Sequence, residues 1–138
     1  MRALRVDKLT YAALEATLEA HAIGRREDVP VIRMLGSNVE EIGTRATALA
    51  AALDGNGWRT RVIDGVSTIG GGSAPGAELP TRLVQLERDG LSADQIEERL
   101  RSSDPPIIAR IQDDYVVLDL RTVLPEQDQI LMQLQAGF

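Results

Sequence analysis

Residues 70–76 form the strongest break in this chain and constrain its fold more than any other segment. They read Gly70-Gly71-Gly72-Ser73-Ala74-Pro75-Gly76, a run that neither a helix nor a strand tolerates, so it predicts a loop. Residues 58–66 before the loop alternate in part between apolar and polar side chains, as a strand does, and residues 79–86 after it can form another strand. The loop is therefore expected to connect two strands.

Capping patterns predict two helices in the first half of the chain. Asp7 can cap a helix that runs to about residue 21. Ser37 and Glu40 form a capping box for a second helix, which stops at the glycine-rich residues 54–57.

An extended segment and a third helix are also expected. The short apolar run 29–35 is expected to be extended, because the residue before a proline disfavours the helical conformation. Ser92 and Gln95 form a second capping box, and Pro105-Pro106 ends the helix that this box opens.

The last third of the chain predicts a hairpin followed by a helix. Residues 107–111 and 115–120 are apolar strands around the polar turn 112–114. Pro125 can occupy the first turn of a final helix. Together the elements predict an α+β fold, with helices on one face of a mainly antiparallel sheet, in a single domain over residues 1–138.

The composition argues against several classes of function. A net charge of -6 and a pI near 4.8 argue against a general electrostatic grip on nucleic acid. The chain has no cysteine and one histidine, so we expect no metal site. No apolar run approaches the roughly 20 residues of a membrane span, and the N-terminus lacks a signal peptide. We therefore expect a cytoplasmic protein that does not contact membranes.

Two segments could bind an anion. Arg2 and Arg5 are three residues apart, so a helical first turn would direct both guanidinium groups the same way, as a clamp for a tetrahedral oxyanion. The alternative is a solvated terminal turn. The triple glycine with Ser73 could present backbone amides to an anion or could serve only as a flexible connection. It lacks the pattern of a P-loop.

Arg110 is the third candidate, because it lies in the middle of an expected strand between apolar neighbours. An arginine there is costly to bury unless it is paired. It either pairs with Asp119 on the opposing strand or faces a cleft and holds a substrate carboxylate. Asp119 and Arg121 could equally form a cross-strand salt bridge on an exposed face. His21 is expected to be an ordinary residue at a helix end.

Several motifs in order carry a resemblance to a known family. The first is Arg2-Ala3-Leu4-Arg5-Val6-Asp7-Lys8-Leu9-Thr10, followed by residues 12–18. The second is Ile69-Gly70-Gly71-Gly72-Ser73, followed by Pro75 and by Glu78-Leu79-Pro80. The third is Pro106-Ile107-Ile108-Ala109-Arg110-Ile111, followed by Leu118-Asp119-Leu120-Arg121-Thr122-Val123. Essentially the whole chain thereby resembles the C-terminal part of the bacterial L-seryl-tRNA(Sec) selenium transferases, also called selenocysteine synthases.

The resemblance implies the small C-terminal domain of a fold type I pyridoxal-phosphate transferase. Such full-length enzymes form large homo-oligomers and convert seryl-tRNA(Sec) to selenocysteinyl-tRNA(Sec), with selenophosphate as the selenium donor. The motif arginines are implicated in holding the donor, so the resemblance assigns Arg2 and Arg5 to selenophosphate binding and favours the clamp. Arg110 and Ser73 are further candidates for substrate binding.

The sequence departs from the family pattern in two respects. The family's Schiff-base lysine lies upstream of the motif and has no counterpart here, where Lys8 is the only lysine. We therefore expect the large cofactor domain to be absent, and this chain to have no catalytic residue, no bound pyridoxal phosphate and no activity alone. In addition, Ala109 replaces a usual glycine, and its methyl group is expected to narrow the approach to Arg110.

Two alternative functions stay open at this point. Sugar-phosphate ammonia-lyases that use pyridoxal phosphate resemble the same motif near its start, so the chain could be their C-terminal domain. It could also be a stand-alone interaction or RNA-binding module, although the acidic pI argues against a broad RNA surface.

Overall fold

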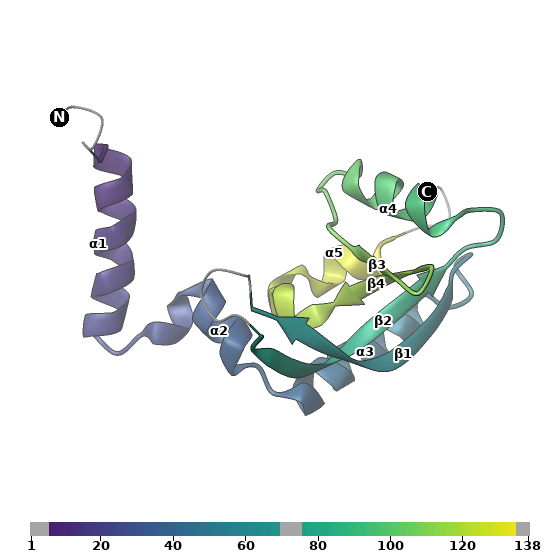
Figure 1. The fold of residues 1–138 in the computed structure, drawn as a ribbon, viewed down its shortest axis with the longest axis horizontal. Helices are drawn as coiled ribbons and strands as arrows, with labels where there is room; N and C mark the ends of the chain where they lie inside the picture. Colours follow the sequence, from purple (N-terminus) through teal and green to yellow (C-terminus); the bar gives the residue numbers. More distant parts are fainter. Residues whose placement is uncertain (1–5, 70–75, 135–138) are drawn as a thin grey trace. The chain divides into compact units, whose positions relative to one another are not determined.

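The computed structural model describes residues 6–69 and 76–134. The chain divides into two compact units, Met1–Gly36 and Ser37–Phe138, and each is described by itself below. Figure 1 shows that the second unit contains the whole β-sheet. None of the described helices is long and apolar enough to cross a membrane.

The first unit consists of short helical segments. Helix α1, Lys8–Ala22, begins where the Asp7 carboxylate accepts hydrogen bonds from the amides of Leu9 and Thr10, which confirms the predicted cap. A 3₁₀ turn, Arg26–Asp28, follows it.

The prediction of an extended segment at residues 29–35 is wrong, because helix α2 spans Pro30–Gly36. Only Val29, the residue before the proline, is extended, with φ -83° and ψ 111°. Proline is well tolerated at the first helical position, where the missing N–H would have had no partner in the helix. The restriction on the residue before proline therefore acted on one residue instead of the whole run.

The second unit begins with helix α3, Val39–Leu53, which follows the apolar spacing of the sequence. The cap lies one residue later in the sequence than predicted. The Asn38 side chain, not that of Ser37, caps the helix by accepting from the amide of Glu40 at 2.8 Å. Asparagine and serine are equally good caps, so the sequence alone did not separate them.

The sheet contains four strands, and every neighbouring pair is antiparallel, as predicted. The strands are β1 (Arg59–Thr68), β2 (Glu78–Glu87), β3 (Arg110–Gln112) and β4 (Tyr115–Asp119). Their order in the sheet is β1-β2-β4-β3. Asp113 and Asp114 connect β3 to β4 with φ values of 52° and 65°, the pair of left-handed conformations that a two-residue hairpin loop requires.

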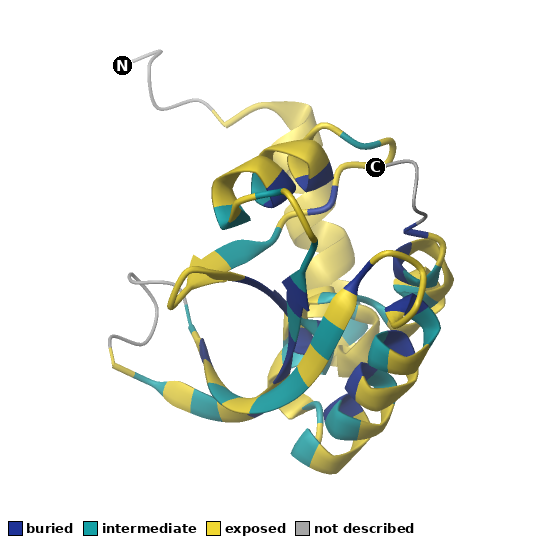
Figure 2. Cartoon of the chain, turned by 90° about the vertical axis from the view of Figure 1, so that its right-hand side faces the viewer, coloured by how far each residue is buried: buried dark blue, intermediate teal, exposed yellow. Residues whose placement is uncertain are grey.

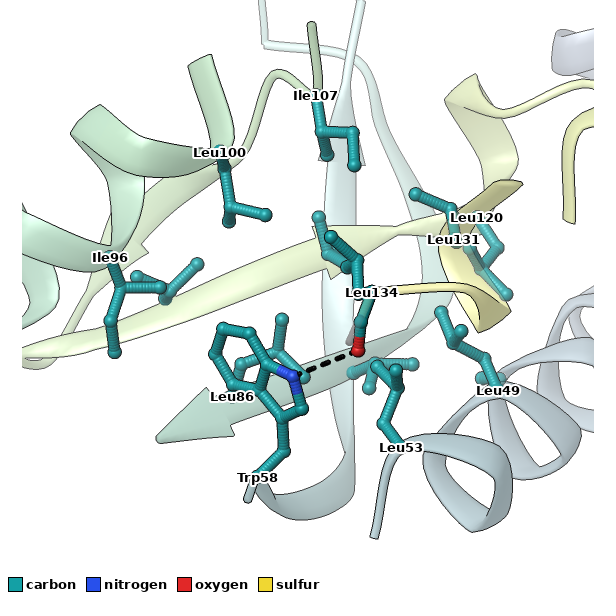
Figure 3. Close-up of a cluster of buried hydrophobic side chains, with 14 of the residues drawn as sticks. Leu49, Leu53, Trp58, Leu86, Ile96, Leu100, Ile107, Leu120, Leu131 and Leu134 are labelled. Carbon is teal, nitrogen blue, oxygen red and sulfur yellow. Dashed lines mark hydrogen bonds between the residues drawn. The ribbon is translucent and has the colours of Figure 1, made fainter. Parts of the chain in front are cut away.

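One face of the sheet and the helices of the second unit form a hydrophobic core. Its residues come from alternating positions of β2 and β4, from α3, from α4 (Ala93–Arg101) and from the C-terminal helix α5 (Asp128–Met132). Figure 3 shows Leu86 of β2 beside Leu53 of α3 and Trp58, whose ring N–H donates to the carbonyl of Leu134 at 3.2 Å. The structure thus confirms an α+β fold with helices on one face of an antiparallel sheet.

An ion pair joins α3 to the C-terminal segment. Arg45 donates to both carboxylate oxygens of Asp128, at 2.7 and 2.6 Å, and also to the carbonyls of Leu120 and Val123. The two side chains are only 19% and 16% exposed. All three guanidinium nitrogens of Arg45 are therefore used within the fold.

Candidate functional site

The face of the sheet that points away from the core carries the polar side chains of interest. Side chains alternate along a strand. Since Val116 and Leu118 belong to the core, Val117 and Asp119 must point to the other face, called here the second face. Arg110 is paired with Val117 in the strand register and lies on the same face. Figure 2 shows how strongly the sheet curves.

Asp119 lies at the centre of a hydrogen-bonded cluster on the second face. One carboxylate oxygen accepts from the hydroxyl of Ser67 on β1 at 2.6 Å. The other accepts from the hydroxyl of Thr81 on β2 at 2.8 Å and from the amide of Arg121 at 3.1 Å. The carboxylate therefore has three donors from three segments of the chain, and its charge is well stabilised.

Arg121 extends this cluster and is buried, with 6% of its surface exposed. Its Nε donates to the hydroxyl of Ser67, Nη1 to the carbonyl of Ser37 and Nη2 to the carbonyl of Pro80. The prediction of an exposed cross-strand pair between Asp119 and Arg121 is wrong. The 3₁₀ turn Leu120–Thr122 follows β4 directly and turns the arginine into the interior.

Arg110 does not pair with Asp119, so that alternative is also wrong. Instead, its Nη2 donates to the carbonyl of Val66 on β1 at 3.0 Å. Its Nε is buried and has no acceptor within the described residues. Asp119 is already engaged by Ser67 and Thr81, which explains why the expected pair does not form.

Ala109 does not narrow the approach to Arg110, contrary to the expectation. Its side chain packs against the hydrophobic core. Consecutive residues of an extended chain point to opposite faces, so the methyl group lies on the side away from the guanidinium group. The methyl group of Ala109 therefore does not lie on the second face.

The other predicted site residues lie outside the described residues or on exposed positions. Arg2, Arg5 and Ser73 are outside the described ranges, so the structure does not place them. His21 lies in the last turn of α1 and is exposed. Within residues 6–69 and 76–134, no group of acidic or histidine side chains could hold a metal ion.

The described residues do not fit a pyridoxal-phosphate site. Such a cofactor needs a lysine that forms an imine inside a cleft. Lys8, the only lysine of the chain, is exposed at the first position of α1. No step of a cofactor reaction is therefore assigned to the described residues.

Ser67, Thr81 and the buried position of Arg121 were not predicted from the sequence. Hydroxyl residues in strands are common and carry no signal by themselves. Their role depends on the strand register, which pairs Gly65 with Thr81 and Leu83 with Asp119. This register brings β1, β2 and the end of β4 together. Ser67 lies three residues before the glycine-rich loop and Thr81 five residues after it, and this closeness to the loop is the one hint that the sequence offers.

The fold and this cluster define a small α+β domain whose second face is built around charged groups. Comparison with known proteins identifies its family. The chain belongs to the L-seryl-tRNA selenium transferase family, whose model matches residues 1–124.

Curated relatives agree with this assignment. The L-seryl-tRNA(Sec) selenium transferase of Aquifex aeolicus is 44% identical over 126 residues, or 91% of this chain. Those of Clostridium botulinum and Nitratidesulfovibrio vulgaris are 38% and 42% identical over 96% and 88% of this chain. The chain spans only 27–29% of the length of these relatives and matches their C-terminal part. These names do not support the ammonia-lyase or the stand-alone module.

Proposed function

We propose that this chain acts as the small C-terminal domain of a selenocysteine synthase and that Arg2 and Arg5 bind the selenium donor, selenophosphate. The observation that carries the proposal is the family match over residues 1–124, which includes the Arg2–Lys8 motif. The full-length protein would convert seryl-tRNA(Sec) to selenocysteinyl-tRNA(Sec), the reaction that the relatives' names describe.

The local chemistry of the motif supports separate roles for its charged residues. The Asp7 carboxylate accepts from the amides that begin α1, and it therefore has a structural task. Arg2 and Arg5 precede this cap in the sequence. Two guanidinium forks three residues apart are well suited to a tetrahedral oxyanion, because each offers several donors in one plane.

Pyridoxal phosphate would be held by the rest of the full-length protein, which would also supply the Schiff-base lysine. The isolated chain would therefore bind no cofactor and would be inactive. Its partners would be the large domain, seryl-tRNA(Sec) and further copies of the full-length protein. A cytoplasmic location stays a prediction.

Replacing Arg2 and Arg5 by alanine in the full-length protein tests the donor assignment. We expect KM for selenophosphate to rise by roughly tenfold or more, since the two substitutions remove charge-assisted hydrogen bonds to the phosphate-like group. Selenium transfer to seryl-tRNA(Sec) at varied selenophosphate concentrations measures this change, and the absorbance of the cofactor should stay unaltered.

Arg25→Ala is a matched control for this experiment. Arg25 belongs to the same unit and forms an exposed ion pair with Asp28, so its loss should leave donor saturation unchanged. Equal saturation curves for the double variant and the control would contradict the proposal. Turnover of a phosphosugar by the unaltered protein would favour the ammonia-lyase instead.

A further inference from the structure

We propose that Arg110 is an anion-binding residue, whose guanidinium group takes a small oxyanion, a phosphate or a carboxylate, on the second face of the sheet. The site consists of residues that the structure describes. It goes beyond the proposed function, which places the selenium donor on Arg2 and Arg5.

The hydrogen bonds of Arg110 account for only part of its donor capacity. A guanidinium group has five N–H donors. The bond from Nη2 to the carbonyl of Val66 is the one that Arg110 makes with the described residues, and its Nε is buried without an acceptor. A buried donor without a partner is unfavourable and calls for an explanation.

Two other arginines of the same unit show how this fold satisfies a structural guanidinium. Arg45 uses all three nitrogens on Asp128 and on two carbonyls. Arg121 uses all three on Ser67 and on two carbonyls. Arg110 uses one, so a purely structural role leaves most of its donors unexplained.

The charge of Arg110 also has no acidic partner among the described residues. The ion pairs found within the described residues do not include Arg110. Asp119 on the same face is committed to Ser67, Thr81 and the amide of Arg121. Glu87, which also lies on that face, pairs with Arg59. The positive charge is therefore available to an external anion.

The position of Arg110 permits access. It is the first residue of β3, the last strand in the order of the sheet, and it is only partly buried. The neighbouring methyl group of Ala109 lies on the core side. The bond to Val66 uses one N–H group of Nη2, and the other N–H groups of the two terminal nitrogens can bind one small oxyanion.

The side-chain Nε–Hε resonances of the arginines, recorded by ¹⁵N NMR on this chain, test the proposal directly. Sodium phosphate and sodium acetate serve as probes in separate titrations, with sodium chloride keeping the ionic strength constant. We expect the Arg110 resonance to shift and saturate with at least one probe. The Arg45 and Arg121 resonances are internal controls, because their nitrogens are already bonded.

The Arg110→Lys variant identifies the Arg110 resonance, because that signal disappears from the spectrum. It also removes the planar guanidinium group. Its backbone amide spectrum should be that of the unaltered chain outside β3 and β4, and saturation should be lost. Saturation with phosphate alone would identify a phosphate site, and saturation with acetate alone a carboxylate site. If Arg110 shifts no more than Arg45 with either probe, the proposal is wrong. The selenium-transfer kinetics of the Arg2 and Arg5 variants are independent of this result.

Discussion

At the scale of single residues, Gly65 shows how closely the second face is packed. A Cβ atom on Gly65 would lie 2.5 Å from Cδ1 and 2.7 Å from Cγ of Leu83, which is completely buried. Gly65 does not have a positive φ. The glycine is needed for space, because the leucine side chain crosses directly over it.

Gly65→Ala should therefore destabilise the chain. We expect a loss of about 1–3 kcal/mol in the free energy of unfolding, the usual effect of overpacking a filled core. Urea denaturation measures it.

Gly43→Ala is the control for this prediction, because the added methyl would meet only the Cγ of Arg82, at 3.3 Å. That side chain is exposed and can move, and alanine favours the helix by up to about 1 kcal/mol. Equal stabilities of the two variants would refute this account of Gly65.

At the scale of secondary-structure elements, helix α1 depends on a single carboxylate at its start. Hydrogen bonds from the amides of Thr10 and Leu9 lower the pKa of Asp7 below its ordinary value. A carboxylate with a lowered pKa in the folded state stabilises the fold above the pKa of the unfolded state. This contribution is lost as the pH falls through the lowered pKa.

We therefore expect the first turn of α1 to loosen in acid, below the ordinary aspartate pKa of about 3.9. The amide chemical shifts of Leu9 and Thr10, followed by NMR from pH 6 to pH 2, measure this change. Asp7→Asn keeps an uncharged cap and should remove the pH dependence. Shifts that stay constant over this range in the unaltered chain would exclude the capping role.

Most elements could be predicted from the sequence, because local chemistry determines them. Ser92 and Gln95 form the predicted capping box of α4, and the strands and the β3–β4 hairpin lie close to their predicted positions. The extended conformation predicted for 29–35 was wrong, since the proline restricts only Val29.

The second face could not be predicted to the same degree. Its cluster depends on the register between β1 and β2 and on the turn after β4. These long-range features decide that Asp119 binds Ser67 and Thr81 and forms no ion pair with Arg110. The sequence singled out Arg110 as an unusual residue within a strand, but it did not predict the hydrogen bond to the carbonyl of Val66.

At the scale of the whole sheet-bearing unit, the Arg45–Asp128 pair connects residues 83 positions apart. We expect Asp128→Asn to lower the free energy of unfolding by roughly 1.5–3 kcal/mol, the range for a lost hydrogen bond to a charged group. The pair is largely buried, and Arg45 would lose a charged partner while remaining inside the fold.

Asp89→Asn is the matched control for this pair. Arg59 and Asp89 are also 2.6 Å apart, but their side chains are 62% and 86% exposed. Exposed pairs contribute little, because water and salt screen their attraction. If both variants lose the same stability in urea denaturation, burial does not determine the contribution of the Arg45–Asp128 pair.

Trp58 gives the molecule a built-in optical reporter. It is the only tryptophan of the chain, is almost fully buried, and contacts both the C-terminal segment through Leu134 and the guanidinium group of Arg88. Its fluorescence emission therefore comes from one place in the core, where α3, β2 and the C-terminal residues meet. A red shift of that emission would signal the moment at which water reaches this junction, without any added label.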